Sequence, residues 1–228
     1  AVKSAVDFDK AMTNVGAVLG KSAEDMAGLR DEILALGANS TAGPQAVAEA
    51  FYDIAGGVAD TSTHMAILKA AMSTADAGAA DLGATTNALI SIMNSYKFSA
   101  EEAGYASDVL TRTVGMGVGT MDEFAAALPQ VTGLANSLGI SFGNVGAMTA
   151  YLTTQGNSAS QSVTQLSAMM TALLNPNETM KTALSELGYT TGQAAIESLG
   201  LYGAYQALQG TQTANTCLLY TSPSPRDS

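Results

Sequence analysis

Charge is scarce in this sequence and unevenly distributed. Charged residues make up 13% of the 228 residues, about half the share that is usual in globular proteins. From Phe124 to Asn177 there is no Asp, Glu, Lys, Arg or His. The 20 acidic residues outnumber the 9 basic ones, and the net charge is -11. Because such a surface repels phosphate groups, the composition argues against nucleic-acid binding.

Cysteine and histidine are nearly absent. The single cysteine, Cys217, excludes an internal disulfide and a multi-cysteine metal site. The single histidine, His64, has no second ligand at metal-binding spacing, so we expect a solvated or half-buried surface side chain. The sequence contains no plausible Ser-His-Asp or Cys-His pair and no His-Glu-x-x-His helix. We therefore expect no catalytic, cofactor-binding or metal-binding residues, and a protein that is not an enzyme.

Long apolar runs are missing as well. Polar residues interrupt the uncharged stretch before about 18 apolar residues accumulate, which argues against a transmembrane helix. These residues are Gln130, Asn136, Ser137, Asn144, Gln155, Asn157, Gln161 and Gln165. Aromatic residues make up 6% and there is no Trp, whereas the apolar fraction is 47%. That fraction consists mainly of Ala, Leu, Met and Val, which is typical of helix bundles and too apolar for simple disorder.

Helix-start signals are abundant. Ser99 to Glu102, Thr120 to Glu123 and Ser158 to Gln161 each fit a capping box, in which a hydroxyl and a side chain three residues later satisfy free backbone N–H groups. Asn175 to Glu178 follows the same pattern, with Pro176 expected at the first helical position. Apolar residues then recur at helical spacing. Strand-like alternation is nearly absent, so the sequence predicts an all-α fold of short helices without a sheet.

The expected helices follow one another along the chain as antiparallel hairpins or a bundle. They run from residue 4 to 18, from Ser22 to Gly37, from Pro44 to Gly57, from Thr61 towards Ala80 and from Thr85 to Tyr96, before those that start at Ser99 and Thr120. Pro129 should kink or end the Thr120 helix. Leu-Gly recurs as a stop signal, with glycines at Gly20, Gly37, Gly83, Gly139, Gly188 and Gly200. Their unequal spacing predicts no strict solenoid.

Three further patterns have simple structural interpretations. The segment Gly115-Met-Gly117-Val-Gly119 resembles a dinucleotide loop only faintly and, because no strand precedes it, is expected to be a flexible connector. The acidic residues Glu101, Glu102, Asp122 and Glu123 lie in first helical turns, which favours capping over general acid–base chemistry. Core packing rather than a docking face is expected for the methionines, at positions Met65, Met72, Met93, Met116, Met121, Met148, Met169 and Met170.

The C-terminal residues have a different character. We expect a helical domain over residues 1–210 and a non-domain tail over residues 211–228. From Cys217 the tail resembles adapter sequence translated at the broken end of an assembled reading frame, and a genuine disordered tail is the alternative. Its Ser-Pro pairs are not interpreted as phosphorylation sites. Because the chain begins at Ala1 rather than Met, we expect it to be part of a longer protein.

The order of short helical motifs resembles one family, the phage tail tape measure proteins, in the minor-tail region near their N-terminal part. The matching segments are Phe8-Asp-Lys-Ala-Met12, Val15 to Val18, Leu36-Gly-Ala-Asn-Ser-Thr41, Ala46 to Gly57, Ala70-Ala-Met-Ser-Thr-Ala-Asp-Ala77, Asp108-Val-Leu110, Asp122-Glu-Phe124, Gly139-Ile-Ser141 and Leu173-Leu-Asn-Pro176. They cover nearly all of residues 1–210. Each motif is weakly specific, and their order carries the resemblance.

The resemblance implies a structural protein whose length sets the length of the phage tail. Its implied partners are the tail tube protein, tail assembly chaperones, baseplate or tail-tip proteins and further copies of itself, with host-membrane contact during ejection. Its implied location is the tail tube lumen of the virion, and the host cytoplasm during assembly. The glycine stops instead favour helical hairpins, so we expect a folded module within a longer tape. A membrane-active helical effector and an unrelated bacterial helical adaptor are the alternatives.

Overall fold

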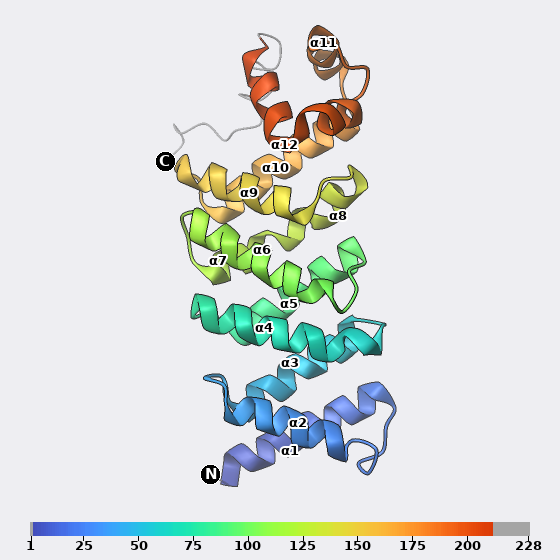
Figure 1. The fold of residues 1–228 in the computed structure, drawn as a ribbon, viewed down its shortest axis with the longest axis vertical. Helices are drawn as coiled ribbons and strands as arrows, with labels where there is room; N and C mark the ends of the chain where they lie inside the picture. The colour runs from blue at the N-terminus through green and yellow to red at the C-terminus, as the bar shows by residue number, and fades with distance from the viewer. Residues whose placement is uncertain (1, 212–228) are drawn as a thin grey trace. The chain divides into compact units, whose positions relative to one another are not determined.

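The computed structural model describes residues 2–211, and this part of the chain is entirely helical (Figure 1). The expected all-α fold without a sheet is confirmed for these residues. The expected domain end at residue 210 lies at the edge of the described part, and the tail predicted over residues 211–228 lies outside it except for Thr211. The described chain divides into two compact units. The first comprises the residues up to Val114 and Thr120–Ala126, and the second comprises Gly115–Gly119 and the residues from Ala127 onward.

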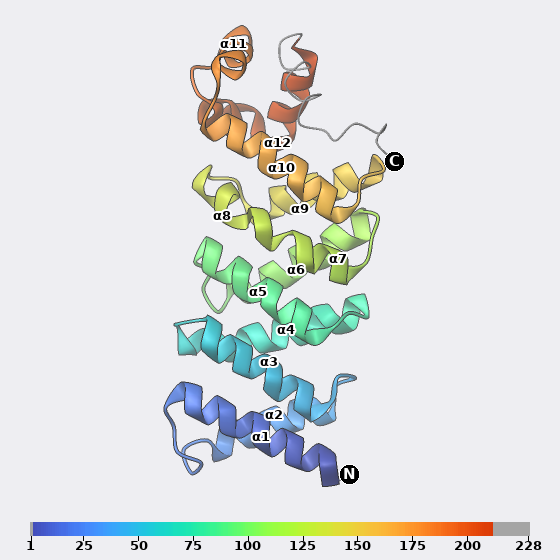
Figure 2. The same ribbon diagram turned by 180° about the vertical axis from the view of Figure 1, so that it is seen from behind.

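The first unit arranges its helices in two layers. One layer contains α1 (Val2–Leu19), α3 (Gly43–Gly57) and α5 (Leu82–Tyr96), and the other contains α2 (Ala27–Ala38), α4 (His64–Gly78) and α6 (Glu102–Met116). Figures 1 and 2 show the two layers from opposite sides. The short helix α7 (Met121–Ala127) also belongs to this unit, except for its last residue, Ala127. The 3-10 turn η1 (Thr61–Thr63) precedes α4.

Helix α3 lies at the centre of the first unit. It contacts α1, α2, α4 and α5. Its apolar residues at helical spacing, Val47, Phe51 and Ile54, are at most 3% exposed, and α1 buries Phe8 and Val15 in the same unit. Burying one such side chain contributes about 1.5–3 kcal/mol, so this apolar stripe decides how the layers pack.

Helix starts in the first unit recur at a nearly constant number of residues along the chain. The unequal spacing of the Leu-Gly motifs does not show this recurrence. The helices of one layer begin at Val2, Gly43 and Leu82, which is a recurrence of about 40 residues and within the range of helical repeat proteins. The repeat is carried by the helix starts and the apolar stripes rather than by a sequence motif. A search for a repeated dipeptide therefore does not find it.

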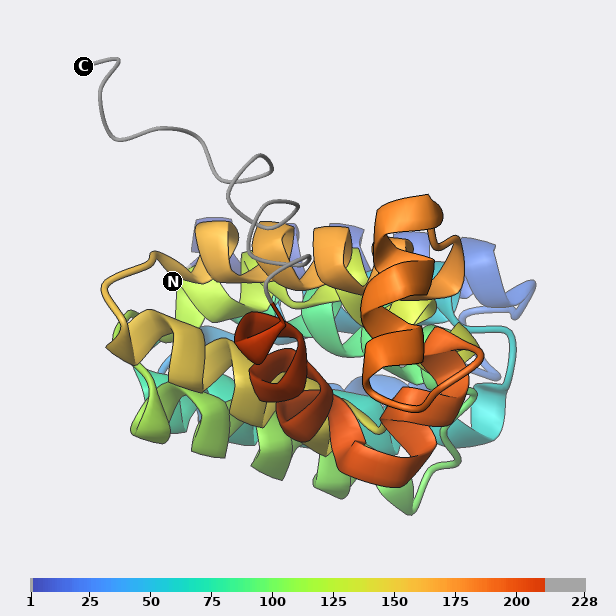
Figure 3. The ribbon, with the colours of Figure 1, turned by 90° about the horizontal axis from the view of Figure 1, so that it is seen from above.

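The second unit packs α8 (Pro129–Ser137), α9 (Phe142–Thr154) and α10 (Ala159–Leu174) against one another. Helix α12 (Gly192–Gly210) contacts α9, α10 and α11 (Glu178–Glu186). At Gly200 the backbone takes φ 70° and ψ 171°, which interrupts α12; the change of direction is visible in Figure 3. The core contains Phe142, Val145 and Met170, each fully buried.

Two expected helix starts are displaced by about one turn. The helix expected to begin at Ser22 begins at Ala27, although the Ser22 hydroxyl still accepts from the Asp25 N–H. The helix expected from Thr85 begins at Leu82, where the Asp81 carboxylate accepts from the Ala84 N–H. The predicted break at Pro129 is confirmed, because α7 ends at Ala127 and α8 begins at Pro129.

Gly37 does not end its helix, contrary to the expectation. It lies inside α2 and is buried. A Cβ at this position would lie 2.3 Å from Pro44 Cα, closer than any real contact. The glycine is therefore explained by the close approach of the next helix start rather than by a left-handed turn. Gly20, Gly139, Gly188 and Gly200 do take the left-handed φ expected of stop signals.

Candidate functional site

A polar cleft in the first unit lies between α3, α4 and the connections that precede α3 and α5. It has a volume of about 460 Å³. Four carboxylates line it, from Glu49 and Asp53 on α3, Asp76 on α4 and Asp81 at the start of α5. No Lys, Arg or His is among its lining residues, so the cleft is acidic.

Most of these carboxylates are engaged by neighbouring donors. Asp76 Oδ1 accepts from the Thr41 hydroxyl at 2.8 Å, Glu49 accepts from the Gln45 amide at 2.9 Å, and Asp81 caps α5. Partial burial, and secondarily the nearby Glu49 carboxylate, raise the pKa of Asp53 above its usual range. This arrangement can attract cations and hydrogen-bond donors.

The sequence did not reveal this cleft, because its carboxylates come from separate elements that only the packing brings together. The spacing of Glu49 and Asp53, one helical turn apart, was the one available signal. Within residues 2–211 no group of three or more His, Cys, Asp or Glu side chains is placed to hold a metal ion.

A second hollow, of about 500 Å³, lies in the second unit along α10. It is lined by uncharged residues from α8, α10 and the residue after α10, namely Gln130, Val163, Thr164, Ser167, Ala168, Thr171, Ala172 and Asn175. These side chains offer hydroxyl and amide groups rather than charges, so the surface suits neutral packing and hydrogen bonding.

His64 is buried, and the expected solvated or half-buried position is wrong. The side chain is 3% exposed, and its Nε2 lies 2.8 Å from the Val58 carbonyl oxygen. Its ring meets Phe51 edge to face, with centroids 5.9 Å apart. The histidine therefore joins α4 to the end of α3 as a structural residue. Sequence reasoning missed this because the carbonyl that it contacts lies in the preceding loop.

The four acidic residues at helix starts serve in capping and in helix-to-helix contacts. The Glu123 carboxylate accepts from the Thr120 N–H and the Thr120 hydroxyl accepts from the Glu123 N–H, which completes the predicted capping box. Glu102 accepts from the Ser99 N–H at 2.8 Å. Glu101 hydrogen-bonds to its own backbone N–H and to the Ser99 side chain, and both contacts lower its pKa.

Asp122 has a role that the sequence did not predict. Its Oδ1 accepts from the Asp81 N–H at 3.0 Å, so the start of α7 is joined to the start of α5. The start of α7 also lies close to the end of α4, since a Cβ on Gly78 would lie 2.5 Å from Met121 Cβ. The acidic residue therefore positions one helix against another.

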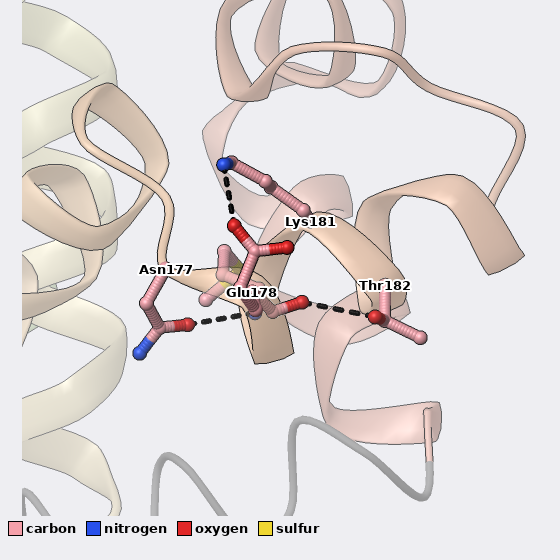
Figure 4. Close-up of polar contacts among 5 residues, drawn as sticks. Asn177, Glu178, Lys181 and Thr182 are labelled. Carbon is pink, nitrogen blue, oxygen red and sulfur yellow. Dashed lines mark hydrogen bonds and ion pairs between the residues drawn. The ribbon is translucent and has the colours of Figure 1, made fainter.

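The capping box at Ser158 and Gln161 is confirmed in full. The predicted cap at Asn175 is wrong by two residues, because α11 begins at Glu178 and Asn177 is its cap. Figure 4 shows the Asn177 side chain at this helix start, with Glu178 paired to Lys181 and the Thr182 hydroxyl donating to the Glu178 carbonyl. Pro176 precedes the cap instead of occupying the first helical position.

Core packing is confirmed for most of the methionines. The side chains of Met93, Met121, Met148, Met169 and Met170 are buried, whereas those of Met65 and Met72 are half-buried.

Met116 is an exception, with 58% exposure, and Val118 beside it is 64% exposed. Met116 is the last residue of α6, and Val118 lies in the expected connector that follows it. The backbone N–H of Val118 donates a hydrogen bond to the Thr153 hydroxyl. No strand precedes this connector in the described chain.

No helix among the described residues is long and apolar enough to cross a membrane.

Comparison with known proteins identifies a viral family. A family model described as phage-related minor tail protein matches residues 30–216. The chain is 23% identical over 187 residues to the tape measure protein of Pneumococcus phage Dp-1, covering 82% of this chain and 16% of that protein. It is 28% identical over 151 residues to a probable tape measure protein of Clostridium phage phiCD119, covering 64% of this chain and 16% of that protein. No solved structure matches.

These matches cover most of the chain but only a small part of its relatives. The two helical units described above therefore correspond to a segment of much longer proteins, as the sequence resemblance implies. Since the family model spans well over half of the chain, the chain belongs to the family of phage-related minor tail proteins.

Proposed function

We propose that this chain is a segment of a tape measure protein, which sets the length of a phage tail, occupies the tail tube lumen and leaves during DNA ejection. The observation that carries the proposal is the family match over residues 30–216, supported by the tape measure proteins that resemble the chain. The same match weakens the alternative of an unrelated bacterial adaptor.

The polar groups of the described residues also favour a structural role. The carboxylates and hydroxyls singled out above act mainly as helix caps and as contacts between helices. The exposed charges are few, and the segment from Phe124 to Asn177 has none. Such a surface limits electrostatic attraction to DNA.

As a tail component, the protein is a part of the virion. Its proposed partners are the tail tube protein, tail assembly chaperones, baseplate or tail-tip proteins and further copies of the same chain. Contact with the host membrane during ejection is also proposed. Association with chaperones is physically reasonable because amphipathic helices expose apolar surface whenever they separate.

The proposal is tested by changing the length of the segment in the phage or prophage that encodes it. Deletion of residues 42–80 removes α3 and α4 and keeps Asp81, the cap of α5. At about 1.5 Å per helical residue, the loss of about 40 residues shortens the tail by about 60 Å. Duplication of the same residues lengthens it by the same amount. Tail lengths are measured by electron microscopy and averaged over many particles.

The matched control is Phe51→Ala, which disturbs the same helix without changing the chain length. It is expected to leave the tail length unchanged. Tails of parental length in both the deletion and the duplication, in particles that contain the altered protein, would contradict the proposed function.

A further inference from the structure

The hollow along α10, which we call the α10 groove, is a surface without charge. It has a volume of about 500 Å³ and is lined by α8 and α10, which lie side by side (Figure 2). None of the helices α8, α9 and α10 contains a charged residue. The groove therefore offers a partner apolar contacts and neutral hydrogen-bonding groups, and no ion pairs.

The middle of the α10 groove consists of small side chains. Ser167, Ala168 and Ala172 are half-buried there, and Thr164 and Thr171 are exposed. The distance between two packed helices depends on the side chains at their contact, and small side chains allow a close approach. A helix of another molecule can therefore lie close to α10.

One large apolar side chain projects from the same face of α10. Leu174 follows Ser167 by seven residues and Thr171 by three, so helical periodicity places it on the groove side. Leu174 is 44% exposed, whereas the other Leu, Met and Val side chains of α10 are at most 3% exposed. The face therefore carries both a projecting apolar side chain and a groove that can receive one.

These two features complement each other when two copies pack antiparallel. A two-fold axis near Ala168 would bring Leu174 of one copy beside Val163 of the other, at the opposite end of the groove. Because a two-fold contact uses the same surface on both molecules, this apolar contact occurs twice. The groove is therefore suited to a second copy of this chain.

The charge of the chain favours this face for self-association over the others. Each copy has a net charge of -11, and in a two-fold contact a carboxylate in the shared patch faces carboxylates of the other copy. Every other α-helix of the described chain carries at least one carboxylate except α5, which packs against α3 and α4. Like charges that oppose each other disfavour association. The α10 groove avoids this penalty.

We propose that the α10 groove is a self-association surface, in which α10 of a second copy packs antiparallel against α10. The association is a property of this chain, whereas its use in a phage tail rests on the proposed function.

The test is sedimentation equilibrium of the full 228-residue chain, at concentrations from about 5 to about 500 µM. The average mass is expected to rise with concentration from that of one chain to that of two. Because the contact contains no ion pair, raising the NaCl concentration from about 0.1 to about 0.5 M should leave the association equal or stronger. A chain that stays monomeric, a mass that exceeds two chains, or association that weakens with salt would overturn the proposal.

A matched pair of threonine substitutions locates the surface. Thr164 and Thr13 are both exposed, and each donates its hydroxyl to the carbonyl four residues earlier in its helix. Thr164→Glu puts a carboxylate into the groove of each copy and is expected to raise the dimer dissociation constant by about tenfold or more. Thr13→Glu adds the same charge to α1 and should change this constant by less than about twofold. Equal weakening by both substitutions would overturn the assignment to α10.

A second pair tests the apolar contact without adding charge. Leu174 on α10 and Leu34 on α2 are similarly exposed, at 44% and 42%. Leu174→Ala removes apolar surface from both halves of the contact and is expected to raise the dissociation constant by about tenfold. Leu34→Ala should leave the constant unchanged. Equal dissociation constants of the two variants would overturn the antiparallel packing.

Self-association and the tape measure function can fail separately. Parental tail lengths after the deletion and duplication would contradict the tape measure function and leave the measured dimer intact. A chain that stays monomeric would overturn the self-association surface and leave the tail-length result intact.

Discussion

The substitution Gly192→Ala tests a close backbone approach within the second unit. Gly192 is the first residue of α12, where Thr191 caps the helix by accepting from the Ala194 N–H. A Cβ on Gly192 would lie 2.3 Å from the carbonyl oxygen of Leu173 and 2.8 Å from its carbonyl carbon and Cα. These are backbone atoms near the end of α10, so no side-chain rotation can relieve the overlap.

The expected cost follows from the shift that the backbone must make. Overpacking by one carbon in a tightly packed site typically costs about 1–3 kcal/mol. With a urea dependence of about 2 kcal/mol per molar, the unfolding midpoint of the second unit should fall by about 0.5–1.5 M. The measurement is urea unfolding of the full chain followed by circular dichroism at the helical band.

The matched control is Gly133→Ala in α8 of the same unit. A Cβ there meets no atom within 4 Å, and Gly133 is exposed in mid-helix. Replacing such a glycine by alanine typically gains about 0.4–1 kcal/mol, mainly by restricting the unfolded chain. The two substitutions are therefore expected to change stability in opposite directions. If Gly192→Ala stabilises the protein as Gly133→Ala does, the reasoning from the close approach is wrong.

Two further predictions concern a helix cap and a titrating group. Ser158→Ala removes the hydroxyl that accepts from the Gln161 N–H and should lower the free energy of unfolding by about 0.5–2 kcal/mol. The control, Ser160→Ala in the same exposed turn, should change the free energy of unfolding by less than about 0.5 kcal/mol. Equal effects of the two substitutions would refute the capping role of Ser158. Because the pKa of Asp53 is raised above 3.8 in the folded chain, the folded state holds the proton more tightly, and stability should fall as pH rises through the window above that value. Asp53→Asn should therefore be more stable than the parent protein at neutral pH. The two proteins should be equally stable at a pH low enough to protonate Asp53 in both the folded and the unfolded state. Urea unfolding midpoints measured between these pH values test this prediction, and a stability difference that does not change with pH would contradict it.

Local sequence signals, namely capping residues, proline and apolar residues at helical spacing, predicted most helices correctly. Capping boxes at Thr120 and Ser158 and the break at Pro129 depend on residues within one turn of each other, so the sequence contains all that is needed. The displaced starts at Ala27 and Leu82 show the limit of this reasoning. At Leu82 a second capping residue, Asp81, begins the helix before Thr85, whereas α2 begins after Met26 without a side-chain cap.

Features that depend on tertiary packing could not be predicted in the same way. His64 is buried because Phe51 and the Val58 carbonyl lie beside it. Gly37 is required by Pro44 across a helix junction. The acidic cleft combines carboxylates from α3, α4 and the start of α5, and no local pattern shows that these elements converge. In each case the deciding partner comes from another element.

The scarcity of charge has a direct structural counterpart in the second unit. Its helices α8, α9 and α10 contain no charged residue, and the caps of α9 and α10 are the neutral side chains of Ser141 and Ser158. An ion pair in this unit, Lys181 with Glu178, is exposed and contributes at most about 1 kcal/mol. Burial of apolar side chains and neutral capping therefore account for most of the stability of this unit. Such stability depends little on salt.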